Sequence, residues 1–522
     1  MSIREILEQY PNLREDLFMR GFLVTDRADL LTKDFLFYGA WHSHQMAGMN
    51  FHWHAKTGAH FFESDGLALF LFGHAYNPFT MQSDEQDLLA YLARSWEHDF
   101  EERLNELSGI FVLGVIANDA LYFVTDTAGL QSACCGVADG HFYLSSHAQM
   151  IGDLCNLQMS EYVKELTAYK WYGRVMGPYL PADLTMFENV KRVVPNQLYT
   201  YRDARVTHKR FYPVRELVMH TSPAQYEKTM VQAAQILRRS MLLVCKKWDK
   251  VHISLTGGVD SGTTFAAANG LYDQIEAFSY LASEKERADC NAAKRISARF
   301  DVPWTLYTVP QDNGEVALFA ERKAVLLHNN GYVANTPDHE LRKRMVLKEQ
   351  FFGSVEVKSW VSEITRGYWY KYYGQKRMPA LSARLYRNLY KIFICNRSLA
   401  KRTDQVFEQY LQDYEYAQIP AQYLPADLHY WEIGCGSWAG LNISEMKYYA
   451  DITVIYNNRK FLDLMLGVPF EKRVSDQHHS DIKRILNKDL SDMGIHVVNA
   501  KETKTRARLL GLLFALNSHL PF

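Results

Sequence analysis

Cysteine is scarce and irregularly spaced in this sequence. The seven cysteines include no CxxC pair, and their number is odd. Disulfide frameworks and zinc ribbons use paired, regularly spaced cysteines, so neither is expected here. Residues 1–9 also lack a charged leader followed by an apolar block. We therefore expect a cytoplasmic protein with free thiols.

Neither sign of charge dominates, and long apolar runs are absent. Lysine and arginine together number 58 against 59 for aspartate and glutamate, which gives a net charge of -1. Such a chain has no overall field that would attract nucleic acid or anionic lipid. The nearest approach to a membrane segment, 509–516, is too short to cross a bilayer. The sequence therefore predicts neither nucleic acid nor membrane as a partner.

Apolar material and length suffice for more than one core. Hydrophobic residues make up 48% of the 522 residues, and at roughly 150 residues per domain the length suggests about two to four domains. Between residues 35 and 212, apolar runs bounded by turn residues predict strands, namely 67–72, 109–116, 121–125 and 141–145. Asn118-Asp119 would turn between two of them, and a helix is expected over 85–104. We predict an α+β layered domain over 35–212, preceded by an N-terminal extension over 1–34.

After a linker around Pro213 the pattern changes to alternating helices and strands. The expected order is helix 225–245, strand 250–255, helix 261–269, strand 276–280, helix 285–300 and strand 304–309. Alternation of this kind is typical of a parallel sheet covered by helices on both faces. The remainder, 314–522, looks mainly helical. We predict an α/β parallel-sheet domain over 224–522 with a helical C-terminal part.

A glycine-rich turn lies between the strand 250–255 and the helix that follows. Unpaired amides and the positive end of the helix dipole converge there, so an anion fits. The glycines let the backbone approach a phosphate, the hydroxyls donate hydrogen bonds, and Asp260 can hold Mg²⁺. The sequence therefore predicts a site for ATP and Mg²⁺, with a tight turn capped by serine and aspartate as the alternative. The binding residues would be Ser254, Leu255, Thr256, Gly257, Gly258, Val259, Asp260 and Ser261.

This turn resembles the SGGxDS motif of the ATP pyrophosphatases, with Thr256 at the position of the first serine. It differs from the P-loop, which needs GxxxxGK[ST]. The resemblance implies a nucleotide alpha-hydrolase (PP-loop) fold that cleaves ATP between its α and β phosphates and keeps pyrophosphate in the turn. The next strand resembles the strand that approaches the adenine in asparagine synthetase, so Ser279 and Tyr280 are expected at the nucleotide.

The segment Ser362–Tyr368 resembles the Asp-Glu-Leu-Phe-Gly-Gly-Tyr segment of asparagine synthetase and its relatives, which supplies acid groups to metal and pyrophosphate. Glu363 matches the glutamate, whereas a serine stands at the position of the aspartate. The resemblance implies that Glu363 joins Asp260 as a metal ligand, and that Lys358 and Arg366 bring positive charge to phosphate. A solvated polar turn is the alternative.

Further along, 456–469 resembles a helix start that follows the active site in the same enzymes. Arg459 and Asp463 are its candidates, with an ordinary helix salt bridge as the alternative. Relatives also place a lysine that stabilises the transition state in the region that follows. Lys483 is the candidate for that role.

Four segments of the first half resemble, in order and spacing, the elements of class II glutamine amidotransferases: Gly73–Asn77, Leu107–Phe111, Asp126–Leu130 and Tyr143–His147. The resemblance implies an Ntn-hydrolase-like sandwich. In that family an N-terminal cysteine attacks glutamine, and this chain begins Met1-Ser2. We therefore expect no glutaminase activity and a scaffold role, as in β-lactam synthetase and lasso-peptide cyclase, whose amine comes from the substrate.

Five histidines between residues 42 and 60 alternate with aromatic residues. Pairs of histidines on one strand face could hold zinc, but this pattern is more often packing. We assign no metal there.

Together these features predict an ATP-dependent amide-forming ligase of the asparagine synthetase type that adenylates a carboxylate and releases AMP and pyrophosphate. Asp260, Glu363 and Lys483 would be catalytic. The expected partners are small-molecule or peptide carboxylate and amine substrates, and the possible assembly is a homodimer. One alternative is a non-catalytic nucleotide-binding scaffold, because the cysteine is lost and the acidic segment is altered. Another is an RNA-modifying enzyme, although the basic surface and CxxC pairs of that class are absent.

Overall fold

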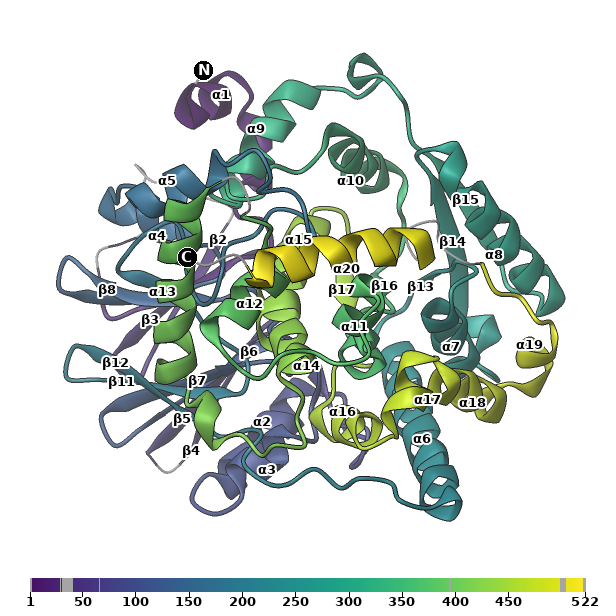
Figure 1. Ribbon diagram of the computed structural model, residues 1–522. Coiled ribbons are helices and arrows are strands. Elements are labelled where there is room, and N and C mark those ends of the chain that lie inside the picture. Colours follow the sequence, from purple (N-terminus) through teal and green to yellow (C-terminus); the bar gives the residue numbers. More distant parts are fainter. Residues whose placement is uncertain are drawn as a thin grey trace.

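The computed structural model describes residues 2–28, 30, 41–64, 66–393, 396–497 and 504–519. Within these ranges the chain forms two six-stranded antiparallel sheets followed by a five-stranded parallel sheet. Figure 1 shows the antiparallel sheets on the left and the parallel sheet on the right, with most helices of the second half around them. The mixed architecture predicted from the sequence is confirmed at this level.

The two antiparallel sheets pack face to face. Their strand orders are β10-β8-β9-β1-β3-β2 and β12-β11-β7-β6-β5-β4. The ring of Phe22 in the first sheet stacks on Phe72 in the second with centroids 4.7 Å apart, and Phe51 meets Phe70 at 5.0 Å. Inward side chains from both sheets thus share one core, as in a sandwich. The strands are β1 (Phe22–Thr25), β2 (Trp41–Met46), β3 (Met49–His54), β4 (Ala59–Ser64), β5 (Leu67–Tyr76), β6 (Ser108–Ala117), β7 (Ala120–Thr125), β8 (Cys134–Ala138), β9 (His141–Ser145), β10 (Val190–Arg192), β11 (Gln197–Arg202) and β12 (Arg205–Arg210).

The four strands predicted in this half are present as β5, β6, β7 and β9. Asn118 and Asp119 turn between β6 and β7 with φ of 50° and 58°, the left-handed values that a type I′ hairpin needs and that these residue types tolerate. The single helix predicted over 85–104 is wrong. It is two helices, α2 (Glu85–Ser95) and α3 (Phe100–Leu104), and between them Trp96 packs edge-on against Tyr122 of β7. That contact fixes the chain at the break.

Part of the segment expected to form an N-terminal extension, Phe22–Thr25, forms the strand β1 of the first sheet. β1 pairs with β3 on one side and β9 on the other, so it lies inside the sheet. The helix α1 (Ile3–Gln9) and the 3₁₀ turn η1 (Pro11–Asp16) precede it and contact α9 (Phe319–Asn329) of the second half. The predicted boundary at 34–35 lies outside the described residues. The extension itself is corrected, because a four-residue apolar run is too short to be distinguished as a strand from its pattern.

The parallel sheet has the order β15-β14-β13-β16-β17. Its predicted strands are present as β13 (Val251–Ser254), β14 (Ile275–Leu281) and β15 (Trp304–Thr308), alternating with the helices α6 (Pro223–Lys247), α7 (Val259–Ala267) and α8 (Arg287–Arg299). Two strands, β16 (Val355–Val357) and β17 (Asp451–Thr453), lie in the part predicted as mainly helical. Each has three residues, so neither shows a strand periodicity in the sequence.

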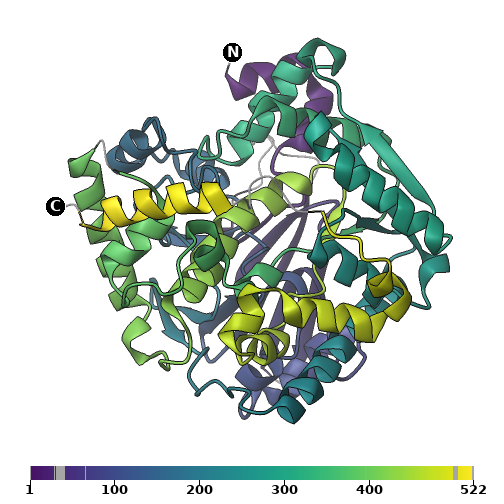
Figure 2. The same cartoon turned by 45° about the vertical axis from the view of Figure 1, so that its right-hand side comes forward.

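The rest of the second half is helical. In both views the C-terminal helix α20, drawn in yellow, lies at the surface (Figure 1, Figure 2), where it contacts α11 and α12. None of the helices that the structure describes combines the length and apolarity needed to span a membrane. The remaining helices are α4 (Ala148–Cys155), α5 (Glu161–Thr167), α10 (Asp338–Gln350), η5 (Ser362–Arg366), α11 (Tyr368–Tyr373), α12 (Ala383–Tyr390), α13 (Arg397–Asp413), α14 (Pro425–His429), the π-helix η7 (Tyr430–Ala439), α15 (Gly440–Met446), α16 (Arg459–Leu466), α17 (Phe470–Val474), α18 (Gln477–Leu486), α19 (Lys488–Asp492) and α20 (Lys504–His519).

The strand order creates a topological switch point beside β13. From β13 the chain proceeds outward to β14 and β15, and then crosses to β16 on the other side of β13. The connections that leave the carboxyl ends of β13 and β16 therefore go to opposite sides. In open parallel sheets this is the position where ligands bind. The predicted glycine-rich turn follows β13, and the second predicted segment follows β16.

A buried ion pair joins the sandwich to the second half. Arg210 at the end of β12 donates from Nη1 and Nη2 to the two carboxylate oxygens of Glu432 at 2.7 and 3.0 Å, and both side chains are almost completely buried. Asn196 and Tyr416 donate to the same carboxylate at 3.0 and 2.5 Å. The carboxylate of Glu432 thus accepts hydrogen bonds from one charged and two polar side chains, as a buried carboxylate requires.

We expect Glu432→Gln to lower the free energy of unfolding by about 3 kcal/mol, because it leaves the Arg210 guanidinium buried without its counter-charge. Chemical denaturation at neutral pH measures the change. The matched control is Glu161→Gln, which removes the partner of Lys164 on the surface and should be nearly neutral. Equal effects of the two substitutions would show that the buried pair does not join the two halves.

Candidate functional site

The glycine-rich turn leaves β13 at Ser254 and enters α7 at Val259, and its residues alternate in burial. Leu255, Gly257 and Val259 are buried, whereas Ser254, Thr256, Gly258 and Asp260 are partly exposed. Leu255 and Val259 therefore anchor the turn in the core. The partly exposed set faces the carboxyl edge of the sheet, where a ligand could reach it.

Hydrogen bonds within the turn fix its shape. The hydroxyls of Thr256 and Ser261 lie 2.8 Å apart, and the Thr256 amide donates to the Ser261 hydroxyl oxygen at 3.3 Å. The amide of Gly258 donates to Thr256 Oγ1 at 3.2 Å, and that of Gly257 donates to Asp289 on α8 at 2.9 Å. Thr256 and Ser261 thus form the turn as well as bordering it. Asp289 belongs to this arrangement and was not predicted.

Gly257 lies in close contact with a distant part of the chain. A Cβ atom at this position would be 2.2 Å from Cγ2 of Val497, and the Val497 amide donates to the Gly257 carbonyl at 3.0 Å. A side chain therefore cannot be accommodated here without moving Val497. Glycine permits a close approach to the backbone at this position. In this structure Val497, in the segment following α19, makes that approach.

Asp260, at the start of α7, connects the turn to the segment that follows β16. Ser362 donates to Asp260 Oδ1 at 2.9 Å, and Nη1 of Arg366 donates to Oδ2. The same guanidinium donates through Nε and Nη2 to both oxygens of Asp476, at 2.7 and 2.8 Å, and Lys371 pairs with Asp476 at 2.8 Å. These two cations hold the pKa of Asp476 well below its ordinary value, against the effect of burial. Asp260 and Arg366, which were each predicted for the site but not as partners of one another, are thus in direct contact.

Glu363 lies next to this network, and one of its two carboxylate oxygens forms no hydrogen bond with the described residues. This oxygen, Oε2, is buried. Burial, and then the nearby charge of Asp260, raise the pKa of Glu363 to about 7. Two adjacent carboxylates, one with an unused oxygen, are a donor set that suits Mg²⁺, which is held by one or two carboxylates together with phosphate oxygens. The residues present therefore fit a magnesium ion brought in with a nucleotide.

Two neighbours of Asp260 were not selected from the sequence, although one of them, Tyr456, begins a stretch that showed the family resemblance. His479 on α18 has Nδ1 3.8 Å from Asp260 Oδ1, and burial lowers its pKa to about 3, so the ring is neutral. The hydroxyl of Tyr456 donates to the Asp260 carbonyl at 3.0 Å. A histidine and a tyrosine at helix and loop positions carry no local signal, because only the fold brings them to Asp260.

Lys358, Ser279 and Tyr280 form a second group at the edge of the sheet. Lys358 is buried and pairs with Glu356 at 2.5 Å, and its ammonium lies 5.9 Å from the ring centroid of Tyr280. The Ser279 hydroxyl donates to the Leu255 carbonyl at 2.8 Å. The charge of Lys358 is therefore compensated within the protein, and Ser279 braces the start of the glycine-rich turn.

Lys483 lies on α18 one helical turn beyond His479. Its Cδ is 3.6 Å from the position that a Cβ on Gly262 would occupy, so the side chain runs along α7. Among the described residues no ion pair of Lys483 is formed, and burial lowers its pKa. His479, rather than Lys483, is the residue of α18 that faces Asp260.

Arg459 and Asp463 serve the contact between the two halves. Arg459 Nε donates to Asn196 at 2.9 Å, and its guanidinium lies 4.9 Å from the ring of Phe211. Asp463 accepts hydrogen bonds from the hydroxyls of Tyr212 and Tyr423. Neither residue of this pair reaches the glycine-rich turn through these contacts.

Two of the five histidines between residues 42 and 60 form hydrogen bonds within the first half of the chain. His52 Nδ1 lies 2.9 Å from the Ser43 hydroxyl, and His54 Nε2 lies 3.1 Å from the Glu15 carbonyl. Burial lowers the pKa of both histidines to about 4. Across the described part of the chain, no cluster of three or more histidine, cysteine or acidic side chains could by itself hold a metal ion.

No protein-family model matches the chain, and no curated protein matches it. Solved structures with some likeness include the glutamine phosphoribosylpyrophosphate amidotransferase from B. subtilis complexed with ADP and GMP, 9% identical, covering 69% of this chain and 74% of that one with a TM-score of 0.24. A structure of the allosteric regulatory enzyme of purine biosynthesis is 10% identical and covers 58% and 77%, also with a TM-score of 0.24. At these TM-scores the likeness assigns neither fold nor activity.

The raised pKa of Glu363 predicts a pH-dependent contribution to stability. Since the pKa is about 7 in the folded protein and 4.5 ordinarily, the native state binds more protons than the unfolded chain between these values. The contribution is therefore complete below about pH 4.5 and is lost as the pH rises through about 7. We expect Glu363→Gln to gain about 1–3 kcal/mol of stability relative to wild type between about pH 5 and about pH 8.

Urea unfolding of both proteins across this pH range measures the difference. Glu321→Gln, which changes a partly exposed glutamate near the start of α9, is the control for removing one carboxylate. Wild-type and Glu363→Gln curves that run parallel with pH would mean that Glu363 is ionised normally in the folded protein.

Proposed function

We propose that this chain binds Mg·ATP at the glycine-rich turn and cleaves it between the α and β phosphates to activate a carboxylate for amide formation. One observation carries the proposal: Asp260 of the turn is bonded to Ser362 and Arg366 of the segment that follows β16. The two connections meet where a parallel sheet has its switch point. The resemblances in both segments point to the same reaction.

In this proposal the chain's own groups bind and neutralise the phosphates. The N-terminal end of α7 attracts their charge, and Arg366 and Lys371 add two cations, which can exchange part of their pairing with Asp476 for phosphate oxygens. Asp260 and Glu363 would hold Mg²⁺, which neutralises charge on the phosphate oxygens when bound. Ser279 and Tyr280, on the adjacent strand, border the place for the adenine.

The proposed chemistry has two steps. A substrate carboxylate oxygen attacks the α-phosphorus of ATP, and the bond from that phosphorus to the bridging oxygen of pyrophosphate breaks. An amine nitrogen then attacks the acyl carbon, AMP departs with the former carboxylate oxygen, and the nitrogen loses one proton. Such reactions depend on positioning and on charge stabilisation. In this proposal the amine comes directly from a substrate or as ammonia.

A nucleotide-binding scaffold without turnover is the second candidate. It is favoured by the altered acidic segment, in which Ser362 stands at the position of the aspartate and donates to Asp260 instead of supplying a second acid group. The contact of Val497 with Gly257 and the ion pair of Asp260 with Arg366 would both have to yield before Mg·ATP could bind as proposed. No contact of the described residues favours an RNA-modifying enzyme.

We expect the purified protein, given Mg·ATP and a panel of carboxylates and amines, to release AMP and pyrophosphate in equal amounts. Asp260→Asn should lower this rate by about 10² or more, because it removes a charge that acts on the phosphates and metal. Asp492→Asn, which alters an exposed carboxylate paired with Lys488 on α19, should leave the rate unchanged. Release of ADP would contradict the proposal, and nucleotide binding without any turnover would favour the scaffold.

A further inference from the structure

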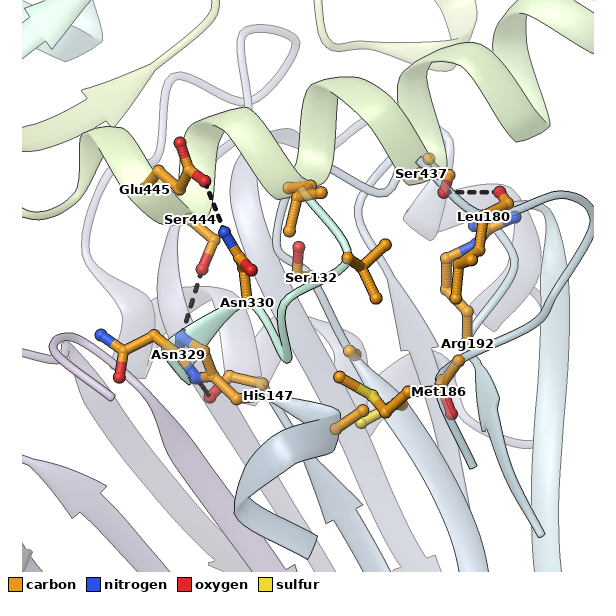
Figure 3. Close-up of a pocket in the computed structure, with 18 of the residues that line it drawn as sticks. Ser132, His147, Leu180, Met186, Arg192, Asn329, Asn330, Ser437, Ser444 and Glu445 are labelled. Atoms are coloured by element: carbon orange, nitrogen blue, oxygen red, sulfur yellow. Dashed lines mark hydrogen bonds between the residues drawn. The ribbon is translucent and has the colours of Figure 1, made fainter. Parts of the chain in front are cut away.

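A cavity of about 120 Å³ lies between the two halves of the molecule. Figure 3 shows residues of the sandwich half, such as His147 and Arg192, below and beside it, and Ser444 and Glu445 on the helix above it. Asn330, at the end of α9, lies on the side opposite Arg192. None of the residues of the nucleotide site lines this cavity, so it is separate from that site.

Arg192 is a buried cation in the cavity wall that lacks a counter-charge. Its side chain donates from Nη2 to the carbonyls of Ala182 and Glu432, at 2.9 and 3.0 Å. Its Nε and Nη1 are buried and form no hydrogen bond with any part of the chain that the structure describes. The residue is only 8% exposed, and within the same part of the chain no carboxylate pairs with it. A buried guanidinium with two unused donors calls for an anion.

Several other buried arginines have such a partner. Arg473 pairs with Asp427, and Arg344 pairs with Glu445 at 2.9 Å. Arg342 and Arg459 are also buried and form no ion pair among the described residues, but neither of them lines the cavity, whereas Arg192 does. A charge-assisted hydrogen bond from one of its unused donors to a carboxylate oxygen would compensate the charge.

At the other side of the cavity, Asn330 has a buried acceptor oxygen that lacks a hydrogen-bond donor among the described residues. Its Nδ2 donates to Glu445 Oε1 at 2.9 Å and to the Ala334 carbonyl at 3.3 Å, so exchanging the amide atoms would set oxygen against oxygen. Its Oδ1 is therefore an acceptor, and it is buried without a partner among the described residues. This oxygen calls for a hydrogen-bond donor. His147, which lies below Asn330 in Figure 3, is neutral, since burial lowers its pKa to about 3.

We propose that this cavity binds a small amino acid, with its carboxylate on Arg192 and its ammonium on Asn330. The size fits, because a protein cavity of about 150 Å³ holds a benzene molecule, and glycine and β-alanine are of similar or smaller size. The apolar part of the lining, including Leu180, Met186 and Leu326, would contact the carbon atoms of the ligand. The proposal does not depend on nucleotide binding at the turn.

Titration calorimetry of the full chain with glycine, β-alanine, acetate and ethylammonium tests this site. Glycine or β-alanine should bind saturably, and acetate and ethylammonium, which each satisfy one end, should bind about tenfold or more weakly. Arg192→Gln should weaken amino-acid binding about tenfold or more, because it removes a charge-assisted pair. Arg402→Gln, which removes a partly exposed arginine paired with Glu165, is the matched control and should leave binding unchanged.

Since Arg192 also bonds to two carbonyls, its replacement could unfold the protein. Ser132→Leu fills the cavity while keeping Arg192 and its bonds, so it should abolish binding in a folded protein, as judged by circular dichroism. The proposal is overturned if no probe binds, if acetate binds as tightly as the amino acids, or if both cavity variants bind like wild type.

Discussion

The guanidinium of Arg366 is the contact on which the candidate site depends. It donates to Asp260 at the start of α7 and, through two parallel bonds, to Asp476 before α18. Three connections that are far apart in sequence thus meet at one buried charge. A buried cation must be compensated, and this requirement fixes the distance between the glycine-rich turn and the segment after β16. It also leaves Lys371 and Glu363 beside the same group of charges.

The irregular helix η7 links this site to the rest of the molecule. At its start the ring of Tyr430 lies 4.4 Å from that of Tyr368, which follows the Arg366 segment. Two residues further on, Glu432 pairs with Arg210 of the sandwich, and Gly436 and Ser437 line the cavity between the halves. π-helical turns are rare and concentrate at functional sites. One helix therefore contacts the segment of the candidate site that follows β16, the interface and the cavity between the halves, so a shift of η7 would be felt at all three.

The sequence was most informative where a function is carried by adjacent residues. The turn 254–261 could be predicted with its strand and helix because glycines, hydroxyls and an aspartate at this spacing indicate a strand-to-helix turn, whether or not it binds phosphate. Arg366 and Asp260 were each selected for charge, and the structure places them in contact. β16 and β17, with three residues each, lack a readable periodicity, and β1 becomes a strand only through its pairing with β3 and β9.

The remaining residues of the site could not be found in this way. Asp476 and His479 lie at the start of α18, Lys371 lies on α11 and Asp289 on α8, and residues of these types are common on any helix surface. Lys483 was selected by its region, yet His479, one turn earlier on the same helix, is the residue whose contact with Asp260 is seen. The missing partner of Arg192 is likewise visible only once the surrounding chain is in place.

The most direct test of the account is a crystal structure with Mg²⁺ and α,β-methylene ATP, an analogue that resists cleavage between the α and β phosphates. We expect the triphosphate to lie on Thr256–Ser261 with Mg²⁺ on Asp260 and Glu363, and Arg366 to turn from Asp260 toward phosphate oxygens. The adenine should lie beside Ser279 and Tyr280. A nucleotide bound elsewhere, with Arg366 and Val497 in their present contacts, would contradict the assignment of this switch point as the phosphate site.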